Sequence, residues 1–303
     1  MGGSHHSEDG DHDYEELTGN PSIYMHLAAG AAAGIMEHAV MYPFDSIKTR
    51  MQVVESNKQL LYSGLVQSFK HVTTSEGARA LWRGISSMIA GAGPAHAVYF
   101  AAYEQAKHYL SGGDDKKINP LAAGLAGGIG TIVSDMLMNP FDVIKQRMQV
   151  EGAKYKTIIN CTRSILKTEG FTALYVSYPT TLLMNLPLQS IQFGLYDVFK
   201  KTLNPDHSYS PLTHVTSGAL SGAIAAAVTT PIDCAKTLLQ TRGLSSDIKI
   251  RTVSGVIEPF KIIIKLYGFK GLFRGILPRV ISFMPGTAIS WTTYEYFKYF
   301  ISS

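Results

Sequence analysis

Apolar residues form six long stretches along this chain, in three pairs that each enclose a shorter amphipathic stretch. The first members of the pairs cover about residues 24–53, 118–150 and 211–241, and the second members cover about 84–110, 177–202 and 275–301. Each is long enough to cross a bilayer as an α-helix, which takes about 20 residues. The shorter stretches, such as 62–77 and 155–170, have helical periodicity with Lys or Arg on one side, as do helices that lie along a membrane surface. The pattern therefore predicts an all-α membrane protein with six transmembrane helices.

The three pairs are repeats of one unit. The phrase PFDSIKTRMQ begins at Pro43, PFDVIKQRMQ at Pro140 and PIDCAKTLLQ at Pro231, at spacings of 97 and 91 residues. Two further phrases follow in the same order in every unit: EGARALWRG, EGFTALYVS and YGFKGLFRG, then YEQAK, YDVFK and YEYFK. A fixed long period decides the architecture before any local pattern does. We expect an acidic tail over 1–21 and three pseudo-symmetric repeats over 22–115, 116–206 and 207–303.

Composition supports the membrane class and argues against several others. Charged residues make up 17% of the chain, below the roughly 25% of a soluble domain, which disfavours a soluble helical repeat protein. Residues 1–20 hold six acids and no Lys or Arg, so we expect a disordered tail and no cleavable presequence. The two cysteines have neither zinc nor disulfide spacing. No nucleophile elbow, phosphate loop or catalytic carboxylate pair is present, so we expect no enzyme.

An acid and a lysine recur three residues apart on every long helix. Such a pair could be neutralised within its own helix. Threefold repetition at two levels instead favours rings of pairs between helices, closing the two ends of a central cavity in turn. On the first helices of the repeats these residues are Asp45 and Lys48, Asp142 and Lys145, and Asp233 and Lys236. On the second helices they are Glu104 and Lys107, Asp197 and Lys200, and Glu295 and Lys298.

The three phrases in triplicate resemble the mitochondrial carrier family over residues 22–300. The resemblance implies six tilted transmembrane helices in three pseudo-symmetric repeats around a central cavity, with three short helices on the matrix side. It also implies a multi-pass monomer in the mitochondrial inner membrane, with cardiolipin bound near Trp82-Arg83-Gly84 and Phe273-Arg274-Gly275. Repeat 2 departs from the family pattern with Val176-Ser177 in place of Arg-Gly, and repeat 3 departs with Tyr267 in place of an acid.

The resemblance also assigns the charged residues to two gates. It implies a matrix gate made by Asp45–Lys145, Asp142–Lys236 and Asp233–Lys48, braced by Gln52, Gln149 and Gln240. It implies a cytoplasmic-side gate made by Lys107–Asp197, Lys200–Glu295 and Lys298–Glu104.

The cargo depends on the residues that line the cavity. His38 and Asp135 each lie seven residues before a gate acid, on nearly the same helix face, and Ala226 takes this place in repeat 3. None of the residues three and two positions before the prolines of the second helices is basic: Gly91 and Ala92, Met184 and Asn185, Ser282 and Phe283. This disfavours nucleotides and carboxylates, whose carriers need Arg or Lys there. Imidazole, thioether, amide and carboxylate groups suit a borderline divalent transition metal, although a lone His or Met could also simply pack.

Longer strings resemble the iron-transporting branch of the carrier family. They include GIMEHAVMYPFDSIKTR (Gly34–Arg50), GAGPAHAVYF (Gly91–Phe100), SYPTTLLMNLP (Ser177–Pro187) and SPLTHVTSG (Ser210–Gly218). Three histidines that matter for iron transport in that branch match His38, His96 and His214. We therefore expect iron to contact His38, His96, Met184, Asn185, His214 and Asp135, with His38, His96 and Met184 as metal ligands.

The function predicted from the sequence is import of ferrous iron into the matrix for haem and iron–sulfur synthesis. Iron is the cargo, and we expect no resident cofactor and no nucleic-acid partner. The alternatives are a carrier of another small cation, a metal chelate or a metabolite, and a membrane adaptor that transports nothing. Intact charges at all gate positions argue against the adaptor.

Overall fold

The computed structural model describes residues 23–54, 64–110, 120–150, 155, 157–204 and 211–283, and among these it leaves the side chains of 23–35, 37, 38, 120–123 and 211 undescribed. The described chain is helical and contains no strand. The acidic tail and the second half of the sixth predicted helix, with Glu295 and Lys298, lie outside the described residues.

The long helices lie where the apolar pattern places them, which confirms the predicted fold class. The first helices of the repeats are α1 (Ile23–Gln52), α4 (Pro120–Gln149) and α7 (Pro211–Thr241), and the second helices are α3 (Ile85–Leu110) and α6 (Tyr178–Leu203). Residues 276–283 begin the sixth. Within the described residues, only Leu212–Leu244 is both long and apolar enough by composition to cross a membrane, with a mean hydropathy of 1.3.

A short helix and a 3-10 turn follow the first helix of each repeat. The short helices are α2 (Leu65–Ser75), α5 (Ile158–Thr168) and α9 (Ile257–Tyr267). The turns after them are η1 (Ala78–Trp82), η2 (Phe171–Leu174) and η4 (Phe269–Phe273). Repeat 3 also contains η3 (Arg242–Leu244) and α8 (Ile248–Arg251), which the sequence pattern did not indicate. The short helices are amphipathic, and each buries only one face.

Each short helix closes a small core with the end of the long helix before it. In repeat 2, Cys161 and Ile165 of α5 are buried against Val143 and Ile144 of α4. Burying a side chain such as Ile165 contributes about 1.5–3 kcal/mol relative to leaving it exposed. Burial also raises the pKa of the Cys161 thiol to about 12, so the group stays a neutral packing residue at physiological pH.

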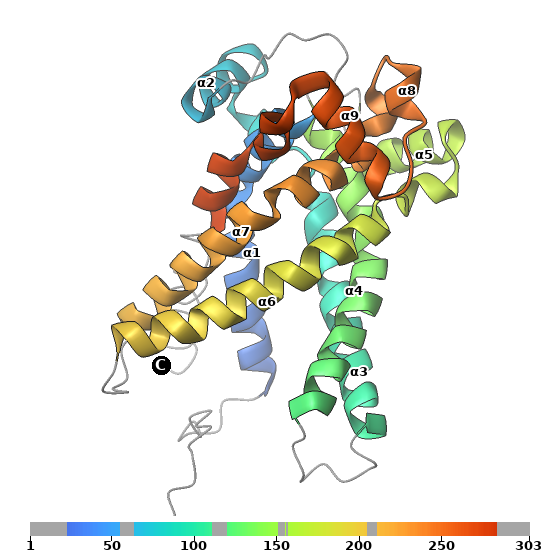
Figure 1. Ribbon diagram of the computed structural model, residues 1–303. Coiled ribbons are helices and arrows are strands. Elements are labelled where there is room, and N and C mark those ends of the chain that lie inside the picture. Colours follow the sequence, from blue (N-terminus) through green and yellow to red (C-terminus); the bar gives the residue numbers. More distant parts are fainter. Residues whose placement is uncertain are drawn as a thin grey trace, which may run out of the picture.

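The long helices converge at one end of the molecule. Figure 1 shows α2, α5, α8 and α9 gathered at the end where α1, α4 and α7 finish, while the α3–α4 pair and the α6–α7 pair part toward the other end. Helices α3 and α4 approach closely at Gly91, where an added Cβ would lie 2.7 Å from Cγ of Phe141. The fold thus brings residues from all three repeats together where α1, α4 and α7 finish.

Candidate functional site

Three ion pairs join the C-terminal halves of α1, α4 and α7. The Nζ–Oδ2 distances are 3.1 Å for Lys145–Asp45, 3.1 Å for Lys236–Asp142 and 2.9 Å for Lys48–Asp233. Each helix gives its acid to one neighbour and its lysine to the other, so the six residues form a closed triangle, here called the ion-pair ring. These pairs join different helices, as the resemblance implies.

The three acids of the ring differ in exposure. The side chains of Asp45 and Asp142 are 31% and 24% exposed, whereas that of Asp233 is 4% exposed. Opposite charges attract more strongly where water is excluded, and removing one member of a buried pair costs about 3–5 kcal/mol because the other stays charged. The ring therefore holds the ends of the three helices together, and Asp233 is the acid that tolerates separation least.

The predicted braces do not act alike. The Gln52 amide donates to Oδ2 of Asp233 at 2.8 Å and accepts from the Thr237 hydroxyl at 2.8 Å. Gln149 accepts from the Thr49 hydroxyl at 2.7 Å and not from a ring lysine. Gln240 is fully buried, and neither atom of its amide has a hydrogen-bond partner among the described residues. Gln52 is therefore the only predicted brace that contacts a ring acid in the part of the chain that the structure describes.

The residue that faces each glutamine also differs among the three interfaces. Thr49 and Thr237 lie six residues after the repeat proline, and the third such position holds Gln146. A threonine hydroxyl reaches the facing glutamine in two of the three interfaces. The third interface places Gln146 and Gln240 together by symmetry, and Oε1 of Gln146 also has no partner among the described residues.

Sequence reasoning missed Arg279, at the start of the sixth helix. Its side chain is 4% exposed, and its Nη1 lies 2.6 Å from Oδ1 of Asp233. Nε donates to the Ala226 carbonyl at 3.2 Å and Nη2 to the Thr229 hydroxyl at 2.9 Å. Arg279 lies six positions before Pro285, outside the pair of positions just before each proline that indicates the cargo. Its counterparts Met88 and Thr181 carry no charge, so no threefold pattern pointed to it.

Arg279 also changes the interpretation of Met184, which was predicted as a metal ligand. The Met184 side chain is buried, and its sulfur lies 3.7 Å and 3.9 Å from Nη2 and Nη1 of Arg279. A guanidinium against the sulfur disfavours a metal cation at the same place. In this conformation Met184 is a packing partner of Arg279.

The structure joins two of the other predicted cargo residues. The Asn185 amide of α6 donates to Oδ2 of Asp135 on α4 at 2.6 Å. In the part of the chain that the structure describes, no other hydrogen bond engages the second carboxylate oxygen of Asp135 or the amide oxygen of Asn185, so both could contact a further ligand. Oxygen donors of this kind bind divalent cations.

The predicted histidines are not brought together in the described residues. The side chain of His38 is not described, and His96 is exposed on α3. His214 lies on α7 with its Nδ1 at 2.6 Å from the Tyr196 hydroxyl. Asp135 lies seven positions before the ring acid of its helix, Asp142, and His214 lies nineteen positions before the ring acid of its helix, Asp233. His214 is therefore twelve positions further from the ring, which is about 18 Å at 1.5 Å per residue. Among the described residues, no group of three or more His, Cys, Asp or Glu could hold a metal ion.

The described charges of the predicted second ring lie at the other end of α3 and α6. Glu104, Asp197 and Lys200 are exposed, and Lys107 is half-buried. Glu295 and Lys298 lie outside the described residues, so the cytoplasmic-side gate stays a prediction.

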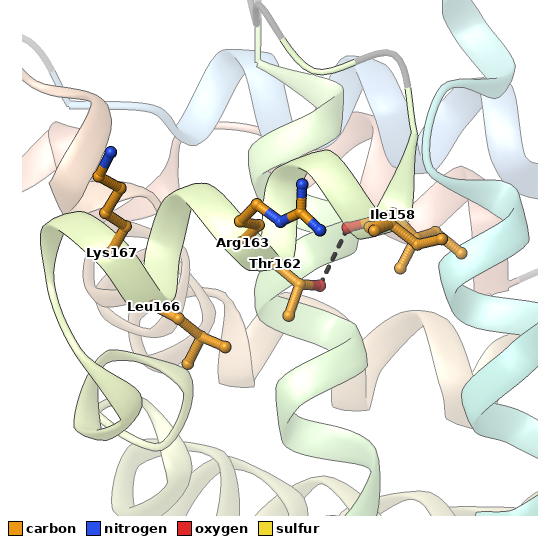
Figure 2. A pocket seen from close by; sticks show the side chains of 6 residues that line it. Ile158, Thr162, Arg163, Leu166 and Lys167 are labelled. Atoms are coloured by element: carbon orange, nitrogen blue, oxygen red, sulfur yellow. Dashed lines mark hydrogen bonds between the residues drawn. The ribbon is translucent and has the colours of Figure 1, made fainter.

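A hollow on the outer side of α5 is separate from the ring. Its lining comes entirely from α5 and includes Ile158, Thr162, Arg163, Leu166 and Lys167 (Figure 2). The Thr162 hydroxyl donates to the Ile158 carbonyl at 2.9 Å, within the helix itself. The hollow thus has two cations beside an apolar surface, and none of the predicted cargo or gate residues lines it.

Comparison with known proteins agrees with the repeat structure. The family described as mitochondrial carrier protein matches residues 19–114, 116–207 and 207–303. An uncharacterized mitochondrial carrier of Schizosaccharomyces pombe is 46% identical over 94% of this chain and 93% of its own length. Mitoferrin-1 of Homo sapiens is 44% identical over 99% of this chain and 90% of its own length. The mitochondrial RNA-splicing protein MRS3 of Saccharomyces cerevisiae is 45% identical over 95% of this chain and 92% of its own length.

Proposed function

Because the chain belongs to the mitochondrial carrier family, we propose that it imports ferrous iron across the mitochondrial inner membrane into the matrix. It is a mitochondrial membrane transporter and not an enzyme. Iron in the matrix would supply haem and iron–sulfur cluster synthesis. The mitoferrins of Homo sapiens, with which this chain aligns over nearly its whole length, support iron as the cargo.

The observation that carries the proposal is the pairing of Asp135 with Asn185 at 2.6 Å, between α4 and α6. It lies beyond the ion-pair ring and combines a negative charge with neutral oxygen donors, a combination that attracts a divalent cation and repels nucleotides. His38 occupies the position equivalent to Asp135 in repeat 1. We propose that His38 and His96 receive the ion and that Asp135 and Asn185 hold it. Weak binding by a few ligands allows release, which transport requires.

The ion-pair ring would act as the matrix gate. With all three pairs formed, α1, α4 and α7 are held together at the end that carries α2, α5 and α9. Iron entering from the intermembrane space would reach Asp135 while this gate is shut. The ring would then open as the cytoplasmic-side gate closes. We further propose that the protein works as a monomer and contacts cardiolipin through the short matrix-side helices.

Uptake by purified protein in liposomes tests the cargo. We expect uptake of reduced iron in preference to nucleotides and carboxylates, and a strong loss of uptake in His38→Ala and in Asp135→Asn. His71→Ala is a matched control, since His71 lies on α2 away from the Asp135–Asn185 pair. Normal iron uptake by both His38→Ala and His96→Ala would overturn the assignment of histidine ligands. Absence of iron uptake by the wild-type protein would favour the alternative, another small cation, metal chelate or metabolite.

A further inference from the structure

Arg279 forms a second cationic contact to Asp233, the ring acid that also pairs with Lys48. Within the ring, Asp45 pairs with Lys145 and Asp142 pairs with Lys236. Asp233 pairs with two cations: the Lys48 Nζ lies 2.9 Å from its Oδ2 and 3.2 Å from its Oδ1, and the Arg279 Nη1 lies 2.6 Å from the same Oδ1. The positions equivalent to Arg279 hold Met88 and Thr181. The asymmetry matches the exposure of the acids, because Asp233 is the buried one.

The burial of Asp233 creates a problem when the gate opens. Opening separates each acid from its lysine. Water can solvate Asp45 and Asp142, which are 31% and 24% exposed, but it has little access to Asp233 at 4%. A buried carboxylate that loses its cation is strongly destabilised. Without a second cation, withdrawal of Lys48 would be the costliest step of opening.

We propose that Arg279 is a positioning residue for the gate, which keeps Asp233 neutralised while Lys48 withdraws and so raises the rate of opening. Its contacts keep it in place during this step. The Ala226 carbonyl and the Thr229 hydroxyl bind it to α7, the helix that carries Asp233, so acid and guanidinium move together. The Met184 sulfur packs against it from α6. This inference rests on the proposed transport function, in which the ring is a gate.

The first test needs no cargo. It measures thermal unfolding of the purified protein for Lys48→Gln, Arg279→Gln and the double variant. We expect each single variant to leave Asp233 with one cation and to lower the melting temperature modestly. The double variant leaves a buried carboxylate with none, so its loss should clearly exceed the sum of the two. When the same three variants are made in Asp233→Asn protein, the loss in the double variant should equal the sum of the two single losses. Additive losses would mean that Arg279 is only a packing residue, and would overturn the proposal.

The second test measures transport kinetics in liposomes, normalised to folded protein. We expect Arg279→Gln to lower the maximal rate roughly tenfold, which is within the range of couplings between sites, and to leave KM little changed. Arg279→Lys keeps the cation and should recover most of the rate, which also covers the case that the glutamine variant folds poorly. Arg242→Gln is the matched control, since Arg242 is a half-buried arginine that donates to the Val253 carbonyl and contacts no ring residue.

The outcomes separate the two proposals. A changed KM or metal preference at an unchanged maximal rate would make Arg279 a cargo contact and overturn its role at the gate. A wild-type protein that moves no iron would overturn the proposed cargo, while the unfolding cycle would still decide whether Arg279 and Lys48 share Asp233.

Discussion

In repeats 1 and 2 an ion pair joins the end of the long helix to the residue that follows the short helix. In repeat 3 apolar contacts join the same two places, here called the helix-end junction. Arg50 pairs with Glu76, and Arg147 pairs with Glu169. The equivalent positions in repeat 3 hold Leu238 and Tyr267, which belong to one hydrophobic cluster. Both members are replaced together, so no charge is left without its partner. The comparison shows that this junction needs a filled, compensated contact and does not need a particular chemistry.

The arginine near the end of the second repeated phrase, Arg83 in repeat 1 and Arg274 in repeat 3, follows the same difference. In repeat 1, Arg83 pairs with Glu76, and in repeat 3 the guanidinium of Arg274 lies 4.4 Å from the ring centre of Tyr267. A cation over an aromatic face replaces an ion pair. Tyr267, a departure from the family pattern, therefore has a partner suited to it.

Repeat 2 has Val176 and Ser177 at the Arg-Gly positions, and its backbone explains the loss of the glycine. Gly84 and Gly275 have φ of 88° and 72°, a region that favours glycine. Ser177 has φ of −88°, and its hydroxyl donates to Oδ1 of Asn139 at 3.1 Å. The chain leaves the turn differently in repeat 2, so it needs no glycine there.

The largest expected effect tests the asymmetry of the ion-pair ring. Asp142→Lys should abolish transport, because it places two cations together at the gate. Adding Lys236→Asp should restore part of the activity, because the pair is re-formed with its charges exchanged. The corresponding exchange at Asp233 and Lys48 should restore much less, because Arg279 would then face a lysine. Uptake in liposomes measures both, and equal recovery in the two exchanges would show that the ring is symmetric in function.

The next effect compares the ionic helix-end junction of repeat 2 with the apolar one of repeat 3. Arg147→Leu should lower the free energy of unfolding by about 3–5 kcal/mol, because Glu169 stays charged and mostly buried. Adding Glu169→Tyr copies repeat 3 and should recover most of the loss. Thermal unfolding in detergent compares the two variants. A double variant no more stable than the single one would mean that an apolar pair cannot replace the ion pair at this junction.

A smaller effect should come from the third glutamine interface. Gln146→Thr places a hydroxyl opposite Gln240, as Thr49 and Thr237 provide in the other two interfaces. One new hydrogen bond to a buried amide should stabilise the closed ring by about 1 kcal/mol and slow transport. Thr49→Val is the reciprocal variant, because it removes the hydroxyl that faces Gln149, and it should destabilise the closed ring. Unfolding temperature and uptake rate check both directions.

The smallest effect is a pH dependence of the stability that the Glu76 ion pairs provide. Burial raises the pKa of the Glu76 carboxyl, but hydrogen bonds and charge from Arg50 and Arg83 outweigh it and hold the pKa below its ordinary value of 4.5. A depressed acid pKa gives a stabilisation that is complete above the ordinary value and is lost as the pH falls through the depressed one. The stability difference between wild type and Glu76→Gln should therefore stay constant from pH 8 to about 5.5 and shrink only below about 4.5. A difference that shrinks near neutral pH would contradict this account.

Sequence and structure agree on the ion pairs of the candidate site and differ on Met184. The threefold pattern indicated a ring of acids and lysines, and the family resemblance implied which lysine pairs with Asp45, Asp142 and Asp233. The structure has the same three pairs. The role of Met184 did not follow from the sequence. Its spacing before Pro187 places it near the cargo level, but its sulfur contacts Arg279, a residue almost a hundred positions away.

The sequence by itself determined the long helices, the three repeats and the positions of the repeated charges, because all of these depend on local periodicity or on repetition. Only the tertiary structure decided that Arg279 reaches Asp233, that Gln240 has no partner among the described residues and that Leu238 and Tyr267 replace an ion pair as a unit. These depend on how helices from different repeats are tilted and rotated against one another. A threefold pattern predicts equivalent contacts, and the three interfaces are filled by different side chains.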